Sequence, residues 1–268
     1  YLTGIGFPDP AFEKRWPAGL HVVGKDILRF HAVTWPAMLL SAGLHLPKRI
    51  FAHGWVMAPE GAKMSKSLGN VIDPEALVKD LGPDALRYAL LREAPYAQDF
   101  VLSPDIVKGR YTRDLGNDLG NLHYRTLSMI EKYCGGKMPK PVQYNELSRL
   151  KAAYDPAMEN LEFNRALEAI WQIAITGANQ LVDDTKPWVL AKDPAKKEQL
   201  DAVLATLAET LRVVSVLAWP VLPKTCEAIR KSLGLGELPK TQDAPLIEGT
   251  LLVKGPPLFP RIELEKAP

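Results

Sequence analysis

The stretch that decides the fold is Gly61-Ala62-Lys63-Met64-Ser65-Lys66-Ser67-Leu68-Gly69-Asn70. Its glycines allow the backbone to adopt positive φ angles, and its two lysines carry charges on long stems that suit phosphate oxygens. Its serines add hydroxyl donors. Apolar residues such as Val56 and Val71 stand on both sides, so packed structure should support the stretch. The pattern predicts a mobile loop that holds a polyphosphate, and the alternative is a solvated basic loop.

Length and composition indicate a soluble globular protein. The chain has 268 residues, enough for one large domain or two ordinary ones, and its 47% hydrophobic and 24% charged residues are typical of that class. The net charge is only +2, so any contact with nucleic acid must come from local basic patches. No apolar run is long enough to span a membrane. We expect a cytoplasmic protein with no membrane contact.

The two cysteines, Cys134 and Cys226, stand far apart in the sequence. Their spacing fits neither a zinc knuckle nor a disulfide framework, which suits a reducing cytosol. The sequence shows no secretory leader, and it starts with Tyr1 rather than methionine. We therefore expect a fragment or a processed piece of a longer chain.

The first part of the chain has the pattern of an α/β domain. Residues 20–23 are a candidate buried strand, followed by Gly24-Lys25-Asp26 and by an apolar helical segment over residues 27–41. A strand, a glycine turn and a helix start place backbone N–H groups near an anionic ligand. Pro36 should kink or restart the helix. Residues 50–57 are the next candidate strand, and residues 98–100 should be a break.

The rest of the chain has helical patterns. Asp73-Pro74 and Ser103-Pro104 combine a good N-cap with proline at the first helical position, and the second of these helices should run to about residue 133. Gly82-Pro83-Asp84 should end one helix and cap the next. Further expected segments are residues 145–154, a helix from Asp155-Pro156 to about residue 182, a helix from Asp193-Pro194 to Pro220, a last helix ending at Gly234, and a tail without helical period.

The pattern thus predicts two units, an α/β unit to about residue 106 and an up-and-down helical bundle after it. The first unit offers only about two convincing strands, whereas open sheets hold about five or six. A doubly wound nucleotide site needs strands on both sides of its crevice. Neither a glycine-rich phosphate fingerprint nor a Walker loop is present. The first unit therefore has the pattern of half an α/β domain.

Candidate ligand-binding residues in the first unit follow the predicted strand. Ile27 and His31 are four residues apart, so they share a helix face and could line a pocket for an apolar substrate. The alternative for His31 is a half-buried histidine with a satisfied hydrogen bond. Asp26 could accept a hydrogen bond from a ribose hydroxyl or simply cap the helix.

Candidate nucleic-acid contacts lie in the helical part. Asn121 and Arg125 are four residues apart and could donate and accept toward a base edge. Trp188 follows Lys186-Pro187 in a loop, where an exposed ring would stack on an unpaired base. The alternative is a tryptophan tucked over the bundle end. Asp183-Asp184 lack a third ligand at suitable spacing, so we expect solvated carboxylates and no metal site.

Several of these stretches together resemble one family. The chain resembles the bacterial methionyl-tRNA synthetases, which are class I aminoacyl-tRNA synthetases, over essentially its whole length. The residues that carry the likeness are Lys63-Met64-Ser65-Lys66-Ser67, Gly24-Lys25-Asp26-Ile27, Phe30-His31, Trp35-Pro36-Ala37-Met38 and Lys186-Pro187-Trp188. The resemblance implies an α/β fold, the second half of a Rossmann-type catalytic domain, followed by an all-α anticodon-binding bundle. The implied divisions are residues 1–112, 113–235 and a tail, 236–268, that packs back on the body.

The resemblance also implies an activity and its residues. The complete enzyme would use ATP, with Mg²⁺, to activate methionine as methionyl-adenylate and would transfer it to methionine tRNA with a CAU anticodon. Zinc is not expected in this portion. The implied roles are catalysis by Lys63 and Lys66; ATP binding by these two and by Gly24, Lys25, Asp26, Val56, Ser65 and Ser67; methionine binding by Tyr1, Ile27 and His31; and anticodon binding by Asn121, Arg125 and Trp188.

The chain also departs from the family pattern. The first signature, His-Ile-Gly-His or similar, and the zinc-bearing insertion are absent. The resemblance therefore implies that this polypeptide alone is inactive and needs an N-terminal catalytic half. No appended oligonucleotide-binding domain follows the bundle, so the parent enzyme should be a monomer. Two alternatives stay open: a stand-alone module that binds a tRNA anticodon, and a subunit of a split synthetase.

Overall fold

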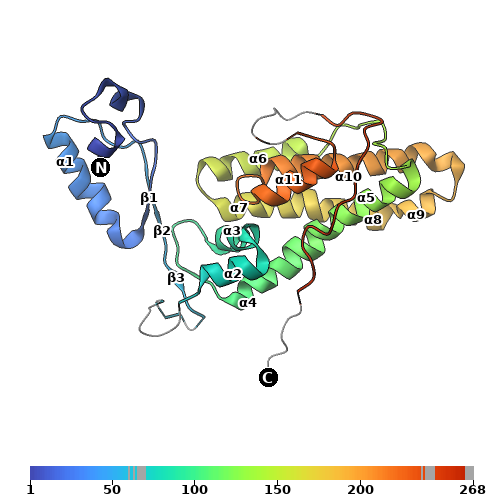
Figure 1. The fold of residues 1–268 in the computed structure, drawn as a ribbon, viewed down its shortest axis with the longest axis horizontal. Coiled ribbons are helices and arrows are strands. Elements are labelled where there is room, and N and C mark those ends of the chain that lie inside the picture. The colour runs from blue at the N-terminus through green and yellow to red at the C-terminus, as the bar shows by residue number, and fades with distance from the viewer. Residues whose placement is uncertain (60, 63, 65–70, 237, 239–244, 263–268) are drawn as a thin grey trace. The chain divides into compact units, whose positions relative to one another are not determined.

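A computed structural model describes residues 1–59, 61–62, 64, 71–236, 238 and 245–262. The chain forms two compact units (Figure 1). Unit 1 comprises residues 1–71 and 94–101, and unit 2 comprises residues 72–93 and 102–268. Each unit has its own core and is described by itself.

Unit 1 contains two short parallel strand pairs. Strand β1 (His21–Gly24) pairs with β2 (Ile50–His53), with Val22 opposite Phe51. Strand β3 (Val56–Met57) pairs with β4 (Phe100–Val101). The predicted strand at residues 20–23 is confirmed. The single strand predicted over residues 50–57 is wrong, since Gly54 and Trp55 interrupt it, and residues 98–100, expected as a break, lead into β4.

The interruption at Gly54 comes from a close backbone contact. A Cβ atom on Gly54 would lie 2.0 Å from the carbonyl oxygen of Gln98. Directly beside this contact the Phe100 N–H donates to the Trp55 carbonyl at 3.0 Å, which starts the β3–β4 pair. Only a residue without a side chain allows the two segments to approach this closely. The tertiary contact therefore decides where the long apolar run is divided.

We predict that Gly54→Ala destabilises unit 1 by about 2 kcal/mol, because the added methyl group must push two backbone segments apart. Urea unfolding followed by tryptophan fluorescence measures the change. Gly19→Ala is the matched control, since a Cβ there meets nothing within 4 Å. Equal stability of the two variants would contradict the close packing at Gly54.

The helical segment of unit 1 is interrupted before Pro36. A 3-10 turn, η3 (Lys25–Ile27), is followed by a π-helical segment, η4 (Phe30–Thr34), and by α1 (Trp35–Ser41). Proline lacks an N–H donor and its ring crowds the preceding turn, and a π-helical bulge accommodates both effects. The predicted restart at Pro36 is confirmed. The core of this unit is formed by Phe12, Trp16 and Leu39.

Unit 2 begins with helices whose starts match the predicted caps. Helix α2 (Pro74–Leu81) is capped by the Asp73 carboxylate, which accepts from the Glu75 N–H at 2.9 Å. Helix α3 (Pro83–Glu93) follows Gly82. Helix α4 (Pro104–Arg110) is capped by the Ser103 hydroxyl, continues through the π-helical segment η6 (Tyr111–Gly120), and runs on as α5 (Asn121–Cys134). Residue 112, the predicted boundary between the catalytic part and the bundle, lies inside this continuous run. No break in the helix marks that boundary, which stays a prediction.

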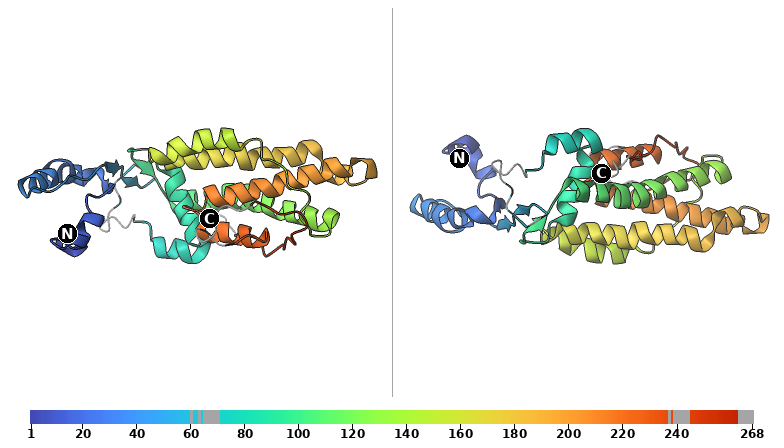
Figure 2. Two further views of the ribbon diagram at one scale, coloured as in Figure 1. Left: turned by 90° about the horizontal axis from the view of Figure 1, so that it is seen from above. Right: turned by 90° about the horizontal axis from the view of Figure 1, so that it is seen from below.

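The helical bundle is built around one long apolar helix, α10 (Lys197–Leu217). Leu204, Leu207 and Leu211 on this helix have no exposed surface. Figures 1 and 2 show the bundle helices side by side, with α5, α8 and α11 in contact with α10 or beside it. The remaining elements are α6 (Leu147–Glu159), α7 (Phe163–Ala169), η7 (Ile170–Thr176), α8 (Gly177–Thr185), α9 (Pro187–Leu190), η8 (Pro194–Lys196) and α11 (Pro223–Ser232).

One predicted helix boundary is wrong. Helix α6 runs through Pro156 to Glu159, whereas the sequence pattern placed a new helix at Asp155-Pro156. The chain reverses instead at Leu161, which adopts a φ of 64°, and the Glu162 N–H donates to the Ala157 carbonyl at 2.8 Å. A proline removes one helical hydrogen bond but does not by itself provide the left-handed residue that ends a helix.

The tail lies along the bundle over residues 245–262. The Met138 N–H donates to the Thr250 carbonyl, and the Val253 N–H donates to the Ser232 carbonyl. The Tyr111 hydroxyl donates to the Pro260 carbonyl at 2.7 Å, and its ring meets that of Phe259 edge-on at 5.7 Å. Backbone hydrogen bonds and aromatic contacts thus attach this segment, which explains why it needs no helical period.

Candidate functional site

Unit 1 contains a cavity of about 650 Å³ beside strand β1 and the helix that follows it. Its lining combines aromatic rings, imidazoles and a thioether: Tyr1, His21, Phe30, His31, Trp35 and Met38 are among the residues. The Tyr1 and Trp35 rings meet edge-on, with centroids 6.1 Å apart. A soft apolar side chain would fit such a wall.

The structure brings Tyr1 and His31 to this cavity but does not bring Ile27 into its lining. Nδ1 of His31 lies 3.0 Å from the carbonyl oxygen of Ile27, one helical turn earlier. His31 therefore makes the hydrogen bond expected of a purely structural histidine, and it also lines the cavity. Ile27 is 39% exposed.

His21 is a cavity residue that the sequence interpretation missed. Neither ring nitrogen is accessible to solvent, and neither has a hydrogen-bond partner among the described residues. Its ring lies 6.2 Å from that of His31. Burial, and secondarily the nearby His31, lowers the pKa of His21. The sequence feature that could have identified His21 is its position directly before two valines in a predicted buried strand. A titratable imidazole is unusual there and indicates a possible functional role.

Gly24 and Asp26 lie where β1 ends. A Cβ on Gly24 would lie 2.5 Å from Oδ1 of Asp26, so a side chain at residue 24 would displace this carboxylate from the strand end. The 3-10 turn that follows receives no side-chain cap. The Asp26 side chain is exposed. Its carboxylate is therefore available to a ligand at the end of β1.

Lys25 takes part in a local cluster with Asp99 and Trp55. Its Nζ lies 2.7 Å from Oδ2 and 2.6 Å from Oδ1 of Asp99, and 4.4 Å from the centroid of the Trp55 ring. The Trp55 N–H donates to Oδ1 of Asp99 at 2.8 Å. The hydrogen bond from Lys25, and then that from Trp55, lowers the pKa of Asp99. The sequence interpretation did not single out Asp99.

The lysine-rich stretch is described only in part. Lys63, Ser65, Lys66 and Ser67 lie outside the described residues. Val56 is half-buried on β3, which leads toward the stretch. Beyond β3, the Ala58 N–H donates to the Ala62 carbonyl, and Gly61 adopts a φ of 73°. The expected positive φ of a flanking glycine is confirmed at Gly61.

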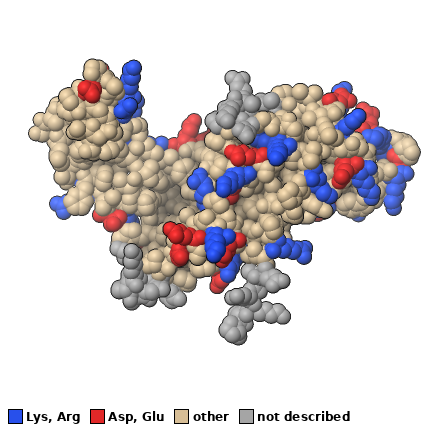
Figure 3. Space-filling view, in the orientation of Figure 1, with Lys and Arg blue, Asp and Glu red and all other residues tan. Residues whose placement is uncertain are grey.

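In unit 2, the candidate base-contacting residues occupy one long helix and one short helix, so the loop predicted around Trp188 is wrong. Asn121 and Arg125 lie on α5, and Nη2 of Arg125 lies 3.2 Å from Oδ1 of Asp183 on α8. Trp188 is 42% exposed, on α9. Asp183, expected to be merely solvated, is exposed but pairs with Arg125. On the face drawn in Figure 3, acidic and basic side chains are interspersed over the bundle, in line with the small net charge.

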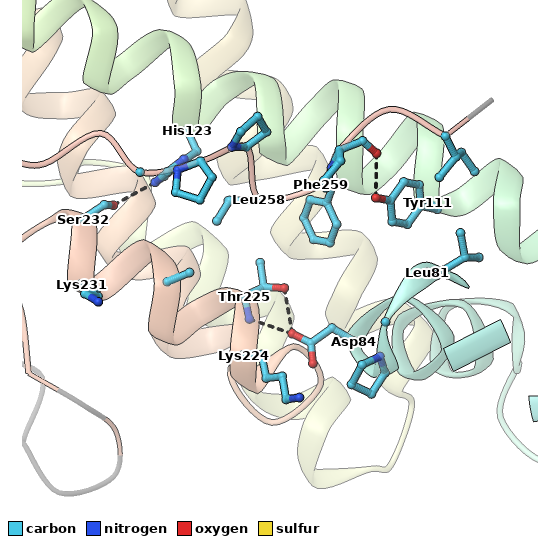
Figure 4. A pocket seen from close by; sticks show the side chains of 18 of the residues that line it. Leu81, Asp84, Tyr111, His123, Lys224, Thr225, Lys231, Ser232, Leu258 and Phe259 are labelled. Atoms are coloured by element: carbon cyan, nitrogen blue, oxygen red, sulfur yellow. Dashed lines mark hydrogen bonds between the residues drawn. The ribbon is translucent and has the colours of Figure 1, made fainter. Parts of the chain in front are cut away.

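A second cavity, of about 870 Å³, lies within unit 2 between the α2–α3 turn, α5, α11 and the tail (Figure 4). His123 is 3% exposed, and its Nε2–H donates to Oγ of Ser232 at 2.8 Å. Ser232 donates in turn to the Ile229 carbonyl. Across the cavity, Oδ2 of Asp84 accepts from both the N–H and the hydroxyl of Thr225 at 2.7 Å. The polar groups that line this cavity therefore stabilise the ends of α11.

The buried His123 predicts a pH-dependent stability. Burial lowers its pKa from 6.5 to about 4. Below pH 6.5 the unfolded chain binds a proton that the folded chain does not, so stability falls as the pH falls toward 4, by about 2 kcal/mol at pH 5. Urea unfolding at pH 7 and pH 5 measures this. In His123→Leu the difference in unfolding free energy between pH 7 and pH 5 should be smaller, because leucine does not titrate. Ser232 keeps its bond to Ile229 in this variant. An unchanged difference would assign the effect to other groups.

The described residues contain no cluster of three or more His, Cys, Asp or Glu side chains placed to hold a metal ion. None of their helices combines the length and the apolar character needed to cross a membrane.

Two family models match the chain in succession. The model described as "tRNA synthetases class I (M)" matches residues 7–127, and the model described as "Anticodon binding domain of methionyl tRNA ligase" matches residues 137–263. The first match contains all the lining residues of the unit 1 cavity except Tyr1, and the second contains Trp188.

Individual relatives agree with these matches. The methionine–tRNA ligase of Caldanaerobacter subterraneus subsp. tengcongensis is 45% identical over 99% of this chain and 44% of its own length, and that of Bacillus subtilis is 46% identical over 99% of this chain and 42% of its own. The solved Mycobacterium tuberculosis methionyl-tRNA synthetase in complex with methionyl-adenylate superimposes with a TM-score of 0.87 and 41% identity, over 97% of this chain and 54% of that one. The chain thus spans less than half the length of the curated relatives it matches.

Proposed function

Since the chain belongs to the methionyl-tRNA ligase family of class I synthetases, we propose that it carries part of the enzyme that activates methionine with ATP and transfers it to methionine tRNA. The predicted fold class, part of a class I catalytic domain followed by an anticodon-binding bundle, is confirmed. One observation supports the proposal most: the aromatic cavity, the Asp26 carboxylate and the strand leading to the lysine stretch all belong to unit 1.

The proposed chemistry is an in-line displacement at the α-phosphate of ATP. The methionine carboxylate attacks the phosphorus and pyrophosphate leaves, without a covalent enzyme intermediate. Catalysis of this kind depends mostly on positioning and on neutralising charge. Lys63 and Lys66 would hold the phosphate oxygens together with Mg²⁺, and Ser65 and Ser67 would support the loop.

The other ligands would meet unit 1 around the end of β1. Asp26 would accept from a ribose hydroxyl, with Gly24 and Lys25 beside it, and the backbone near Val56 would meet the adenine. The methionine side chain would enter the cavity lined by Tyr1 and His31, whose aromatic wall suits a thioether. Ile27 would contribute from the adjoining helical turn.

The bundle would recognise the CAU anticodon. Trp188 presents an exposed ring on which an unpaired base could stack. Asn121 and Arg125 lie on one helix, and both carry hydrogen-bond donors for base edges. The small net charge of +2 favours recognition by these specific contacts.

The active site would be completed by a further catalytic half. The strands of unit 1 form only pairs, which leaves sheet edges without partners among the described residues. Large apolar side chains are exposed on the same unit: Val22, Phe30, Val33, Met38 and Leu40 are each at least 58% exposed. Apolar surface of this extent is typical of a face that another part of a protein covers. We also expect the complete enzyme to be a cytoplasmic monomer.

Methionine-dependent pyrophosphate exchange tests the proposal. We expect no exchange by this chain alone, and exchange by the full-length enzyme or by this chain mixed with a separately produced catalytic half. Binding of methionine tRNA by this chain, with no exchange in any combination, would instead support the stand-alone anticodon-binding module. An intact mass of the source protein equal to the 29.6 kDa of this chain, with exchange only on mixing, would support the split synthetase.

A further inference from the structure

We propose that Asp99 is a positioning residue for the ATP site of unit 1 and that Lys25 acts on that site through Asp99 rather than by binding ATP itself. The inference depends on the proposed function only where it is tested by enzyme activity. It assigns a role to a residue of the stretch 98–100, which the sequence pattern predicts to be a break.

The Asp99 carboxylate joins three parts of unit 1. It accepts two hydrogen-bond contacts from the Lys25 ammonium at the end of β1. It also accepts from the Trp55 N–H between β2 and β3. Its own backbone leads into β4, which pairs with β3. One side chain thus links the ends of both strand pairs.

The link lies next to the proposed polyphosphate loop in the sequence. Strand β3 begins one residue after Trp55 and is followed by the Ala58–Ala62 turn. Gly54 and Gln98 are in backbone contact on the other side of Trp55. Any shift of Asp99 would therefore move the start of β3 and the Ala58–Ala62 turn that follows it.

The Lys25 ammonium is already committed in this arrangement. Both carboxylate oxygens of Asp99 lie within 2.7 Å of Nζ, and the Trp55 ring covers it at 4.4 Å. A cation paired in this way contributes little net charge to a phosphate. The side chains of Lys25 and Asp99 are 39% and 36% exposed, so the pair itself adds little to global stability. We therefore expect the Lys25–Asp99 pair to affect the position of Trp55 and of strands β3 and β4 more than the global stability.

Steady-state pyrophosphate exchange by the full-length enzyme tests the catalytic part. Asp99→Asn and Lys25→Met should each lower kcat roughly tenfold with little change in KM for ATP, because a displaced loop weakens only transition-state contacts. The double variant should be no worse than the poorer single one, since either change breaks the same link.

Hydrogen exchange on this chain tests the structural part without any activity. In either single variant the amides of residues 55–58 and 100–101 should exchange faster than in the parent chain. The matched controls are Lys48→Met and Asp9→Asn, which change exposed charges of the same unit and should leave both readouts unchanged.

Two results would overturn the proposal. A raised KM for ATP in Lys25→Met but not in Asp99→Asn would show that Lys25 binds ATP directly. Unchanged exchange of residues 55–58 and 100–101 in both variants would show that Asp99 does not hold these segments. If the parent full-length enzyme itself lacks pyrophosphate exchange, the proposed function fails, and the hydrogen-exchange result alone decides the role of Asp99.

Discussion

Lys66→Ala should lower kcat for pyrophosphate exchange by roughly 100- to 1,000-fold in the full-length enzyme, the scale on which removal of one transition-state donor acts. The charge on the departing pyrophosphate develops as the α-phosphate bond breaks. A lysine that approaches only at that stage stabilises the transition state and not the bound substrates. KM for methionine and for ATP should therefore change much less than kcat.

Steady-state kinetics at varied ATP and methionine concentrations separate these quantities. Lys79→Ala is the control, because Lys79 is an exposed lysine on α2 in the other unit. Lys63→Ala should show the same kind of effect with a smaller size. Loss of affinity for both substrates with kcat intact would contradict the assignment, because it would make Lys66 a ground-state ligand.

Trp188→Ala should lower the rate of tRNA charging by roughly 100-fold at limiting tRNA, as expected if the stacking of one base and its neighbouring contacts is lost. Methionine activation should stay near normal. The reason is that Trp188 is 42% exposed on a short helix, α9, and its ring is available to a base. Recognition and activation would thus depend on different residues of the same chain.

Comparing tRNA charging with pyrophosphate exchange in one preparation measures this split. Trp188→Phe should retain part of the charging activity, since a smaller ring still stacks. Val189→Ala is the matched control, because Val189 is its exposed neighbour on α9, at 48%. A loss of activation in Trp188→Ala, or a lower midpoint of thermal unfolding, would make Trp188 a structural residue.

Local signals in the sequence predicted many element boundaries. The helix starts at Asp73 and Ser103 are confirmed because a capping side chain and its backbone donor lie within three residues of each other. The restart at Pro36 follows from the geometry of one residue type. These features depend on neighbouring residues only, so no tertiary information is needed to predict them.

Boundaries that depend on distant contacts were predicted wrongly. The 50–57 run is divided because Gly54 meets Gln98, which is far along the chain. Strand β4 exists because it has β3 as a partner. Helix α6 passes through Pro156, and the left-handed residue that ends this helical run is Leu161, a residue type that does not favour that conformation. In each case the deciding contact or backbone conformation has no signature in the local pattern of hydrophobic residues.

The candidate sites show the same division. The sequence by itself determined the family resemblance, the lysine stretch and the Gly-Lys-Asp strand end, because each is a short run of residue types with direct chemical meaning. It left Trp188 open between an exposed and a tucked ring, and the structure shows it 42% exposed. Only the tertiary structure brought His21 into the cavity with Tyr1 and His31, paired Arg125 with Asp183, and placed Asp99 between Lys25 and Trp55. Packing and charge pairing join residues that are distant in the sequence, and these interactions are established only when the chain folds.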